Sequence, residues 1–418
     1  MLVNGGFRGA ATERPRGVLI LVENLPVPFD RRTWQEACAL RAAGYTVSVI
    51  GPTGDGCEKL YEVIDGVHVY RYHLGVEAAS PVGYLREYAT ALVRSFVLAW
   101  RVLHRHGFDV IHACNPPDLL FLIGGFFKLL GKKFVFDHHD INPELYEAKF
   151  GRRDWLYRAL LAAEYLSFRT ADIVLATNDS YKRIAITRGR VDRSRVFVVR
   201  SGPSLVRVRP VPPDDKLKCG RRFLVGYVGV MGAQEGIDCR LRAVRHIVYD
   251  LGRTDIQFVL VGGGTSLGEM RALAARLGVA QYVTFMGRVP DDELLRALNT
   301  ADVCINPDRA NEMNDKSTMN KIMEYMALSK PIVQFDLTEG RYTALESSLY
   351  ARRGDDADFG NLIVALLDDP DLRKAMGEFG YKRVRNELEW RYQVRDLLTA
   401  YEALWPQAPG RRHETPAA

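Results

Sequence analysis

Two glycine-rich segments in the second half of the sequence each follow an apolar run. Gly229-Val230-Met231-Gly232 comes after Phe223–Tyr227, and Gly262-Gly263-Gly264 comes after Ile256–Val261. Because glycine has no side chain, its backbone N–H group can approach a phosphate closely. Glycine also serves ordinary turns, which is the alternative for either segment alone. Two such segments, each at the end of an expected strand, favour a site for a phosphate-bearing ligand.

A polar segment further along the chain combines a helix signal with charged residues. Residues 314–330 read NDKSTMNKIMEYMALSK. Asp315 or Ser317 is expected to cap a helix that runs to about Ala327, and the N–H groups at its amino end would bind an anion. Three polar residues at a spacing of four would share one face of it: Lys316, Asn320 and Glu324. The alternative is a surface network of side chains.

Two adjacent histidines in the first half form a second candidate. His138, His139 and Asp140 follow the apolar run Phe134–Phe136. A histidine at the end of a strand can hydrogen-bond a sugar hydroxyl or a carbonyl oxygen, although a lone histidine is more often structural.

These residues need a scaffold, and the hydrophobic pattern predicts an α/β one. Apolar strands and helices alternate in a first series, with expected strands at residues 17–22, 45–50, 110–112, 133–137, 172–176 and 196–200 and helices at 33–43 and 118–130. A second series follows the proline-rich stretch 203–213, with strands at 223–227, 256–261, 282–286, 302–306 and 331–335 and helices at 239–251 and 267–277. Such alternation predicts two Rossmann-like domains facing each other, with ligands in a cleft at the carboxyl ends of the strands.

Length and composition agree with two folded domains. The 418 residues are 47% hydrophobic and 26% charged, and domains of about 150–200 residues are the usual size. The six cysteines are scattered, which is typical of reduced thiols in the cytoplasm and indicates neither a disulfide framework nor a zinc site. We expect a loose leader at 1–16, a first domain at 17–205, a second domain at 206–390, a helix at 391–408 that returns to the first domain, and a tail at 409–418.

Charge is uneven along the chain. Residues 1–210 carry a net charge of +8, whereas the whole chain carries +6. The basic residues are not interleaved with aromatic residues in a nucleic-acid-binding motif, so no nucleic acid is expected as a partner. An inner-membrane surface is one candidate partner, and an ordinary solvated surface is the alternative.

Two stretches could provide such a membrane contact. Residues 84–106 form an expected helix with interspersed arginines and an apolar stripe that consists of Leu85, Tyr88, Leu92, Phe96, Ala99 and Leu103. Residues 151–158 add Arg152, Arg153, Trp155 and Arg158. The alternative is that the stripe is simply the face that packs on the core.

At this point the sequence resembles the family 4 glycosyltransferases of GT-B fold, in particular bacterial ones that build surface polysaccharides. The resemblance covers about residues 17–405. It is carried by the order and spacing of short pieces: Glu23-Asn24-Leu25-Pro26, Phe29-Asp30-Arg31-Arg32, Asp137-His138-His139-Asp140, Tyr227-Val228-Gly229, Gln234-Glu235-Gly236-Ile237-Asp238, Val261-Gly262-Gly263-Gly264, Phe285-Met286-Gly287-Arg288-Val289, and Lys321-Ile322-Met323-Glu324-Tyr325-Met326-Ala327 with Lys330-Pro331.

The resemblance implies that the domain at 17–205 binds the acceptor and that the domain at 206–390 binds the nucleotide-sugar donor. It also implies roles for individual residues. Glu324 resembles the family's ribose-binding glutamate, and His139 the histidine that contacts the transferred sugar. Arg288 and Val289 stand where the nucleobase is usually held. The expected donor-binding set is Gly229, Val230, Gly232, Gly263, Arg288, Val289, Ser317, Thr318, Lys321 and Glu324. The expected acceptor-side set is Asn24, Arg31, Arg32 and Asp140, and the expected catalytic set is His139, Lys316 and Glu324.

Three positions depart from the family pattern. Lys316 stands where the family has its first glutamate, and Val230 and Glu235 stand where it has an Arg and a Lys that neutralise the diphosphate. We interpret this as relocation of the phosphate-binding charge to Lys316 or Lys321.

The implied activity is retaining transfer of a hexose from a UDP- or GDP-linked sugar, used as a substrate, to a saccharide acceptor that is expected to be lipid-linked. No cofactor and no obligatory metal are expected, because a helix amino end and lysines can stabilise the leaving phosphate. The expected location is the cytoplasm, with peripheral contact to the inner membrane. The alternatives are a catalytically silent GT-B scaffold protein and a GT-B nucleotide-sugar epimerase.

Overall fold

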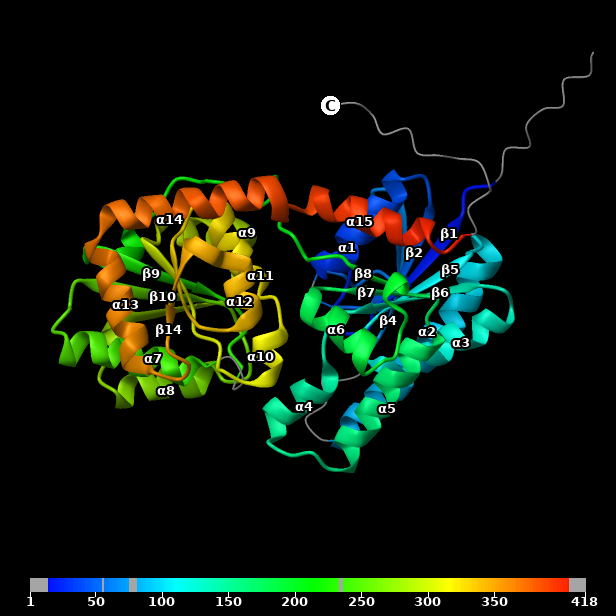
Figure 1. Cartoon of the computed structure of the whole chain (residues 1–418), viewed down its shortest axis with the longest axis horizontal. Coiled ribbons are helices and arrows are strands. Elements are labelled where there is room, and N and C mark those ends of the chain that lie inside the picture. The colour runs from blue at the N-terminus through cyan, green and yellow to red at the C-terminus, as the bar shows by residue number, and fades with distance from the viewer. Residues whose placement is uncertain (1–13, 55, 75–80, 233–235, 406–418) are drawn as a thin grey trace, which may run out of the picture. The chain divides into compact units, whose positions relative to one another are not determined.

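The computed structural model describes residues 14–54, 56–74, 81–232 and 236–405. Most of the predicted leader 1–16 and all of the predicted tail 409–418 lie outside these residues, as does Glu235. Figure 1 shows two sheets flanked by helices, and their strands are parallel except for one edge strand, so the predicted α/β class of Rossmann-like sheets is confirmed.

The strands between Gly17 and Val198 form an eight-stranded sheet in the order β3-β4-β2-β1-β5-β6-β7-β8. Its strands are β1 (Gly17–Leu21), β2 (Thr46–Pro52), β3 (Tyr61–Ile64), β4 (Val67–Tyr72), β5 (Val110–Cys114), β6 (Lys133–His138), β7 (Ile173–Ala176) and β8 (Val196–Val198). β1 pairs in parallel with β2 and β5, whereas β3 and β4 form an antiparallel hairpin that the sequence analysis missed.

The strands between Phe223 and Ala351 form a six-stranded sheet in the order β11-β10-β9-β12-β13-β14. They are β9 (Phe223–Val228), β10 (Ile256–Val261), β11 (Val283–Gly287), β12 (Val303–Asn306), β13 (Ile332–Phe335) and β14 (Ser348–Ala351). Each of these pairings is parallel, so the carboxyl ends of all six strands lie along one edge of the sheet.

The helices connect and cover these strands. They are α1 (Arg31–Ala42), α2 (Pro81–Arg105), α3 (Phe121–Leu129), α4 (Asn142–Phe150), α5 (Trp155–Thr170), α6 (Asp179–Thr187), α7 (Ile237–Arg245), α8 (Leu267–Arg276), α9 (Asp291–Thr300), α10 (Glu312–Lys316), α11 (Asn320–Ala327), α12 (Thr338–Ala344), α13 (Asp356–Asp368), α14 (Pro370–Arg383) and α15 (Trp390–Glu402). α15 contacts the end of β8, where the Arg200 backbone N–H donates to Gln393 Oε1 at 2.8 Å.

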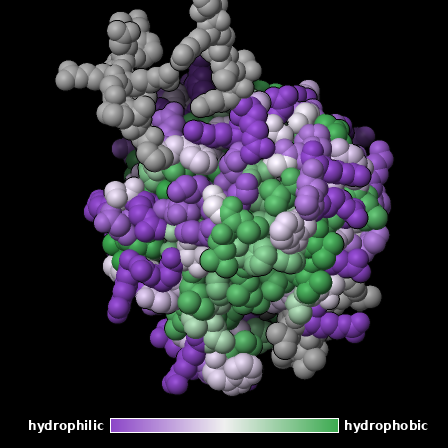
Figure 2. Space-filling model, turned by 90° about the vertical axis from the view of Figure 1, so that its right-hand side faces the viewer, coloured by the Kyte–Doolittle hydropathy of each residue, from purple (hydrophilic) through white to green (hydrophobic). Residues whose placement is uncertain are grey.

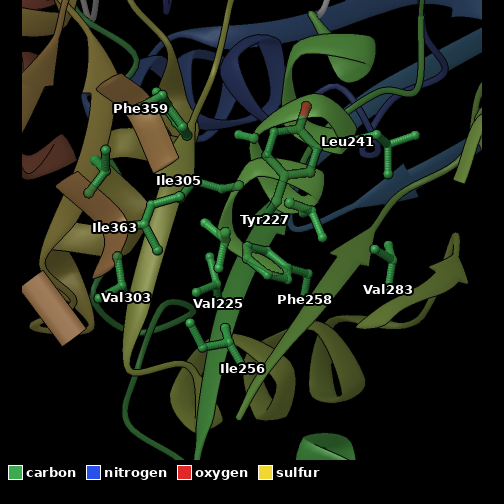
Figure 3. Packing of buried hydrophobic residues seen from close by; sticks show 14 of the residues in the cluster. Val225, Tyr227, Leu241, Ile256, Phe258, Val283, Val303, Ile305, Phe359 and Ile363 are labelled. Atoms are coloured by element: carbon green, nitrogen blue, oxygen red, sulfur yellow. The ribbon is translucent and has the colours of Figure 1, made fainter. Parts of the chain in front are cut away.

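Apolar side chains from strands and helices fill one side of the six-stranded sheet. Figure 3 shows Val225 and Phe258 on the strands, with Leu241 of α7 and with Phe359 and Ile363 of α13 in the same cluster. Tyr227 belongs to the same cluster and is completely buried. Burial of apolar area on this scale is the main force that holds the strands in place.

Backbone proximity divides the chain into two compact units. The first comprises the residues up to Asp137 together with Thr170–Ile173, and the second comprises His138–Arg169 and the chain from Val174 onward. The six-stranded sheet lies wholly in the second unit. The predicted domain boundaries stay a prediction.

Adjacent glycines in α3 provide a test of the packing in the first unit. A Cβ atom on Gly124 would overlap the ring of Phe134, whereas a Cβ on Gly125 would lie at an ordinary 3.6 Å from Thr170 Cγ2. We expect Gly124→Ala to lower the free energy of unfolding by about 1–3 kcal/mol through overpacking. Gly125→Ala should raise it by up to about 1 kcal/mol, because alanine favours a helix. Urea unfolding of both variants measures this, and equal changes would contradict the packing.

Candidate active site

The two predicted glycine segments pack against each other at the carboxyl edge of the six-stranded sheet. The Gly229 N–H donates to Val261 O at 3.1 Å, and the Met231 N–H donates to Gly263 O at 2.9 Å. The backbones approach so closely that a Cβ on Gly262 would overlap the carbonyl group of Gly229. Gly262 has a φ of +134°, a region that other residues rarely adopt. A Cβ on Gly229 would in turn overlap the Tyr227 hydroxyl, so the fold requires glycine at both positions, and the two segments pack directly against each other.

A lysine ammonium group lies beside this pair of loops. Lys321, in the first turn of α11, is 11% exposed, and its Nζ atom lies 3.1 Å from Asp308 Oδ1 and 3.4 Å from the Tyr227 hydroxyl. A Cβ built on Gly229 would be 3.4 Å from the same Nζ atom. The ammonium group of Lys321 therefore lies against the Gly229 loop.

A second cation stacks on the same tyrosine. The guanidinium carbon of Arg240 lies 3.4 Å from the ring centre of Tyr227, and Lys321 Nζ lies 4.9 Å from it. Arg240 is 2% exposed. Because a cation is attracted to the face of an aromatic ring, Tyr227 holds two positive charges beneath the glycine loops.

Two oxygen atoms after β12 provide acceptors near this cation. Asp308 is 1% exposed and Asn306 is 1% exposed, and within the described residues neither Asp308 Oδ2 nor Asn306 Oδ1 has a hydrogen-bond partner. Buried acceptors without partners are uncommon in proteins. The described part of the fold therefore encloses two acceptors without a donor near the ion pair of Asp308 with Lys321.

Glu324 lies one turn after Lys321 on α11. Its carboxylate accepts a hydrogen bond from Arg207 Nη2, and Arg207 Nη1 also contacts Asp291 Oδ2 at 3.3 Å. The next residue, Tyr325, accepts a hydrogen bond from the Val228 N–H at 2.9 Å. That bond joins α11 to the end of β9, so Glu324 and Lys321 are held next to the Gly229 loop.

The predicted helix at 315–327 is wrong at its start. α10 ends at Lys316, and α11 begins only at Asn320, after an extended Ser317. Neither Asp315 nor Ser317 caps α11: Asp315 bonds Thr338, and Ser317 Oγ donates to Met313 O at 2.7 Å. The physical reason is that partners far away in the sequence hold this stretch: Thr338 donates to Asp315, and Asn178 donates to Lys316 O and Thr318 Oγ1.

Lys316 therefore does not share a helix with Asn320 and Glu324. Its Nζ atom lies 3.2 Å from Glu312 and 3.8 Å from Glu144. Asn178 donates to Lys316 O at 2.8 Å and to Thr318 Oγ1 at 3.1 Å. Of the two candidate lysines, only Lys321 is placed beside the glycine loop by contacts among the described residues.

The remaining predicted donor-side residues lie on loops. Val230 is 58% exposed, whereas Gly232 is buried. Gly263 lies beside Arg288, because a Cβ on Gly263 would be 3.7 Å from Arg288 Cβ. Arg288 is exposed and Val289 is partly buried in the apolar cluster behind the sheet.

The two histidines after β6 differ in environment. His138 is fully buried, with its Nε2 atom 3.3 Å from Glu164, whereas His139 and Asp140 are partly exposed. Although burial opposes it, the hydrogen bond and charge of His138 together with Arg188 lower the pKa of Glu164. Arg188 also binds Glu144, the residue that faces Lys316. His138 is thus a structural member of a charged network, and His139 is the one left partly open to solvent.

In the first unit, the structure buries one predicted acceptor-side residue. Arg32 is 7% exposed and binds Asp137 at 2.8 Å and Glu36 at 3.1 Å. We therefore assign Arg32 to the support of the loop after β1, not to direct acceptor contact. Arg31 and Asn24 are exposed.

This buried cluster also contains groups that often bind metals. Glu36, Cys114 and Asp137 bring ligating atoms within 4.8 Å of one another. Burial raises the pKa of Glu36 well above its ordinary value, with opposition from Arg32. A guanidinium group between Glu36 and Asp137 already supplies the positive charge that a cation would bring, so the cluster does not fit a metal ion.

Comparison with known proteins gives matches over most of the chain. A family model described as "Glycosyl transferase 4-like domain" matches residues 30–202, and one described as "Glycosyl transferases group 1" matches residues 222–369.

Curated relatives match over part of their length. A GDP-mannose-dependent monoacylated alpha-(1-6)-phosphatidylinositol monomannoside mannosyltransferase of Corynebacterium glutamicum is 26% identical over 204 residues, 46% of this chain and 52% of the relative. A D-inositol 3-phosphate glycosyltransferase of Nocardia farcinica is 27% identical over 252 residues, 56% of this chain and 53% of the relative. The chain thus spans about half the length of these relatives.

Solved structures share the fold over nearly the whole chain. Sucrose-phosphate synthase from Thermosynechococcus elongatus has a TM-score of 0.76 at 19% identity and covers 93% of this chain and 99% of its own. Anabaena HepE, solved in complex with UDP and glucose, has a TM-score of 0.72 at 15% identity and covers 93% of this chain and 100% of its own.

A buried carboxyl group after β1 makes the stability depend on pH. Burial, with the nearby charge of Glu87, raises the pKa of Glu23 from 4.5 to about 7. The folded chain then binds this proton more tightly than the unfolded chain, so stability falls as pH rises from about 4.5 to about 7. Replacing the Glu23 carboxyl group by a neutral amide removes this fall in stability at higher pH.

We therefore expect Glu23→Gln to gain about 2–3 kcal/mol relative to the wild type when pH is raised from about 5 to about 8. Denaturant unfolding at both pH values measures the difference. Glu378→Gln, a change at an exposed carboxylate of α14, serves as the control and should show no such gain. Parallel pH profiles for Glu23→Gln and the wild type would show that Glu23 keeps its charge in the fold.

Proposed function

Because the chain belongs to the family 4 glycosyltransferases of GT-B fold, we propose that it transfers a hexose from a nucleotide-sugar donor to a saccharide acceptor with retention of configuration. The observation that carries the proposal is the position of Lys321 beside the interlocked glycine loops, one turn before Glu324 on α11. On one helix, the Lys321 ammonium group can bind the phosphates of a nucleoside diphosphate and the Glu324 carboxylate can bind its ribose.

Each part of the site has a role in this reaction. The bond between the anomeric carbon and the phosphate oxygen breaks as a bond to the acceptor oxygen forms, and negative charge grows on the leaving diphosphate. Lys321 stabilises that charge in a mostly buried position, where an electrostatic interaction is stronger than in water. The proton of the acceptor hydroxyl passes to the leaving phosphate. This chemistry requires no metal.

The remaining residues complete the proposal. Arg288 and Val289 border the base, while His139 contacts the transferred sugar. Asn24, Arg31 and Asp140 contact the acceptor. The donor is UDP- or GDP-linked, in keeping with the UDP bound to HepE and the GDP-mannose dependence in the name of the C. glutamicum relative. That name also contains a phosphatidylinositol mannoside, which favours a lipid-linked acceptor and a role in surface glycan synthesis.

A thermal-shift screen across nucleotides, followed by donor-turnover assays, tests the function. A nucleoside diphosphate at about 100 times its dissociation constant should stabilise the chain by about 2.7 kcal/mol. A folded chain that binds no nucleotide and turns over no donor would favour the silent scaffold. Conversion of the donor to an epimer without transfer would favour the epimerase.

Lys321 should act on the phosphates only. We expect Lys321→Met to weaken binding of the nucleoside diphosphate by about 10- to 100-fold, the range of hydrogen bonds to charged groups, and to leave nucleoside binding nearly unchanged. Titration calorimetry with both ligands gives the ratio. Lys316→Met is the matched control and should alter neither affinity. A loss for Lys316→Met comparable to that for Lys321→Met would return Lys316 to the phosphate site.

Glu324 should act on the ribose, which both ligands share. We expect Glu324→Ala to weaken the nucleoside and the nucleoside diphosphate equally, by at least about 1.5 kcal/mol, because a carboxylate can accept hydrogen bonds from two hydroxyl groups. The same calorimetric titrations measure both affinities. Glu312→Ala, an exposed change on α10, controls for the loss of a negative charge. Unchanged nucleoside affinity in Glu324→Ala would mean that this carboxylate serves only to hold Arg207.

A further inference from the structure

Large apolar side chains are exposed along two helices of the first unit. On α3, Leu122, Phe126 and Leu129 follow at helical spacing and are 49%, 38% and 84% exposed. On α2, Val93 and Val97 are 62% and 56% exposed. Figure 2, which looks onto the side of Figure 1 where α3 is labelled, shows apolar side chains gathered into one patch with a hydrophilic border.

Aromatic contacts join the two helices beneath these residues. The ring centres of Phe96 on α2 and Phe126 on α3 lie 5.1 Å apart, and those of Trp100 and Phe127 lie 5.4 Å apart. Phe127 is fully buried. The exposed stripes of α2 and α3 therefore belong to one surface with a packed base, which we call the α2–α3 face. Its members are Val93, Val97, Leu122, Phe126 and Leu129.

The charges on α2 are strongly one-sided. This helix has four arginines, all exposed, and a single acidic residue, Glu87. Arg94 and Arg101 are next to Val93 and Trp100 in sequence. Two further cations, Lys132 and Lys133, follow α3. Such a face is complementary to a surface that has an apolar interior under a negatively charged outer layer.

We propose that the α2–α3 face docks on an anionic lipid bilayer, with its apolar side chains at headgroup depth and its arginines against lipid phosphates. A second copy of the chain fits this face less well, because a two-fold contact would set the arginines of α2 against those of the partner copy. Within the described residues, no helix is long and apolar enough to cross a bilayer, so the contact is with the membrane surface.

Co-sedimentation of the full chain with vesicles tests the proposal. The chain should bind vesicles that mix phosphatidylglycerol with phosphatidylcholine, should ignore vesicles of phosphatidylcholine alone, and should dissociate as salt screens the arginines. Leu129→Glu and Val97→Glu should each lower the partition coefficient by about tenfold or more, because each removes an apolar side chain that enters the bilayer on binding. Leu372→Glu, at a 38% exposed position in the first turn of α14, is the matched control and should bind as the wild type does.

Other outcomes would overturn the proposal. One is a wild-type chain that fails to sediment with anionic vesicles at low salt, and another is equal binding by Leu129→Glu and Leu372→Glu. A dimer in solution that Leu129→Glu dissociates would assign the face to a second copy of the chain. Thermal unfolding and nucleotide binding of each variant verify the fold. Because binding to vesicles is measured without donor or acceptor, its failure is distinct from a failure of the proposed transfer activity.

Discussion

A close backbone approach in the second unit, between Gly229 and Gly262, governs the architecture of the candidate site. Hydrogen bonds from Gly229 to Val261, from Met231 to Gly263 and from Gly262 to Gly287 tie together the ends of β9, β10 and β11. Backbone groups that bond to each other in this way need no side chains to cover them. The candidate site is therefore built on main-chain segments, the loops after β9, β10 and β11, and the sheet holds these loops in place.

The charged side chains beside these loops compensate one another. An ammonium group as buried as that of Lys321 needs a compensating carboxylate, and Asp308 supplies it at 3.1 Å. Tyr227 adds its ring face to Lys321 and to Arg240. The family pattern places phosphate-binding cations on the loop after β9, where this chain has the exposed Val230. In this chain the two cations on the Tyr227 ring, Lys321 and Arg240, come from helices α11 and α7.

Helix α2 shows that a correctly predicted apolar stripe does not identify the apolar residues that are exposed. Two residues of the stripe read from its sequence pack within the protein: Ala99 is fully buried, and Phe96 contacts Phe126 and Phe127. At these two residues the stripe is a packing face, as the alternative interpretation held. The exposed apolar residues, Val93 and Val97, lie outside that stripe. Helical periodicity identifies a face, but it cannot distinguish a face covered by protein from one left open.

By itself the sequence determined the alternation of strands and helices, the class of both sheets, and the two glycine loops, because buried parallel strands need continuous apolar runs and close backbone contacts need glycine. It could not supply the β3–β4 hairpin, whose outer strand is half exposed, or the break between α10 and α11, where Asn178 binds the extended chain at Lys316 and Thr318. It also could not choose between Lys316 and Lys321, or separate the buried Arg32 from the exposed Arg31. Only the tertiary structure decided these points, because each depends on partners far away in the sequence: Tyr227 and Asp308 for Lys321, Glu144 for Lys316, and Asp137 for Arg32.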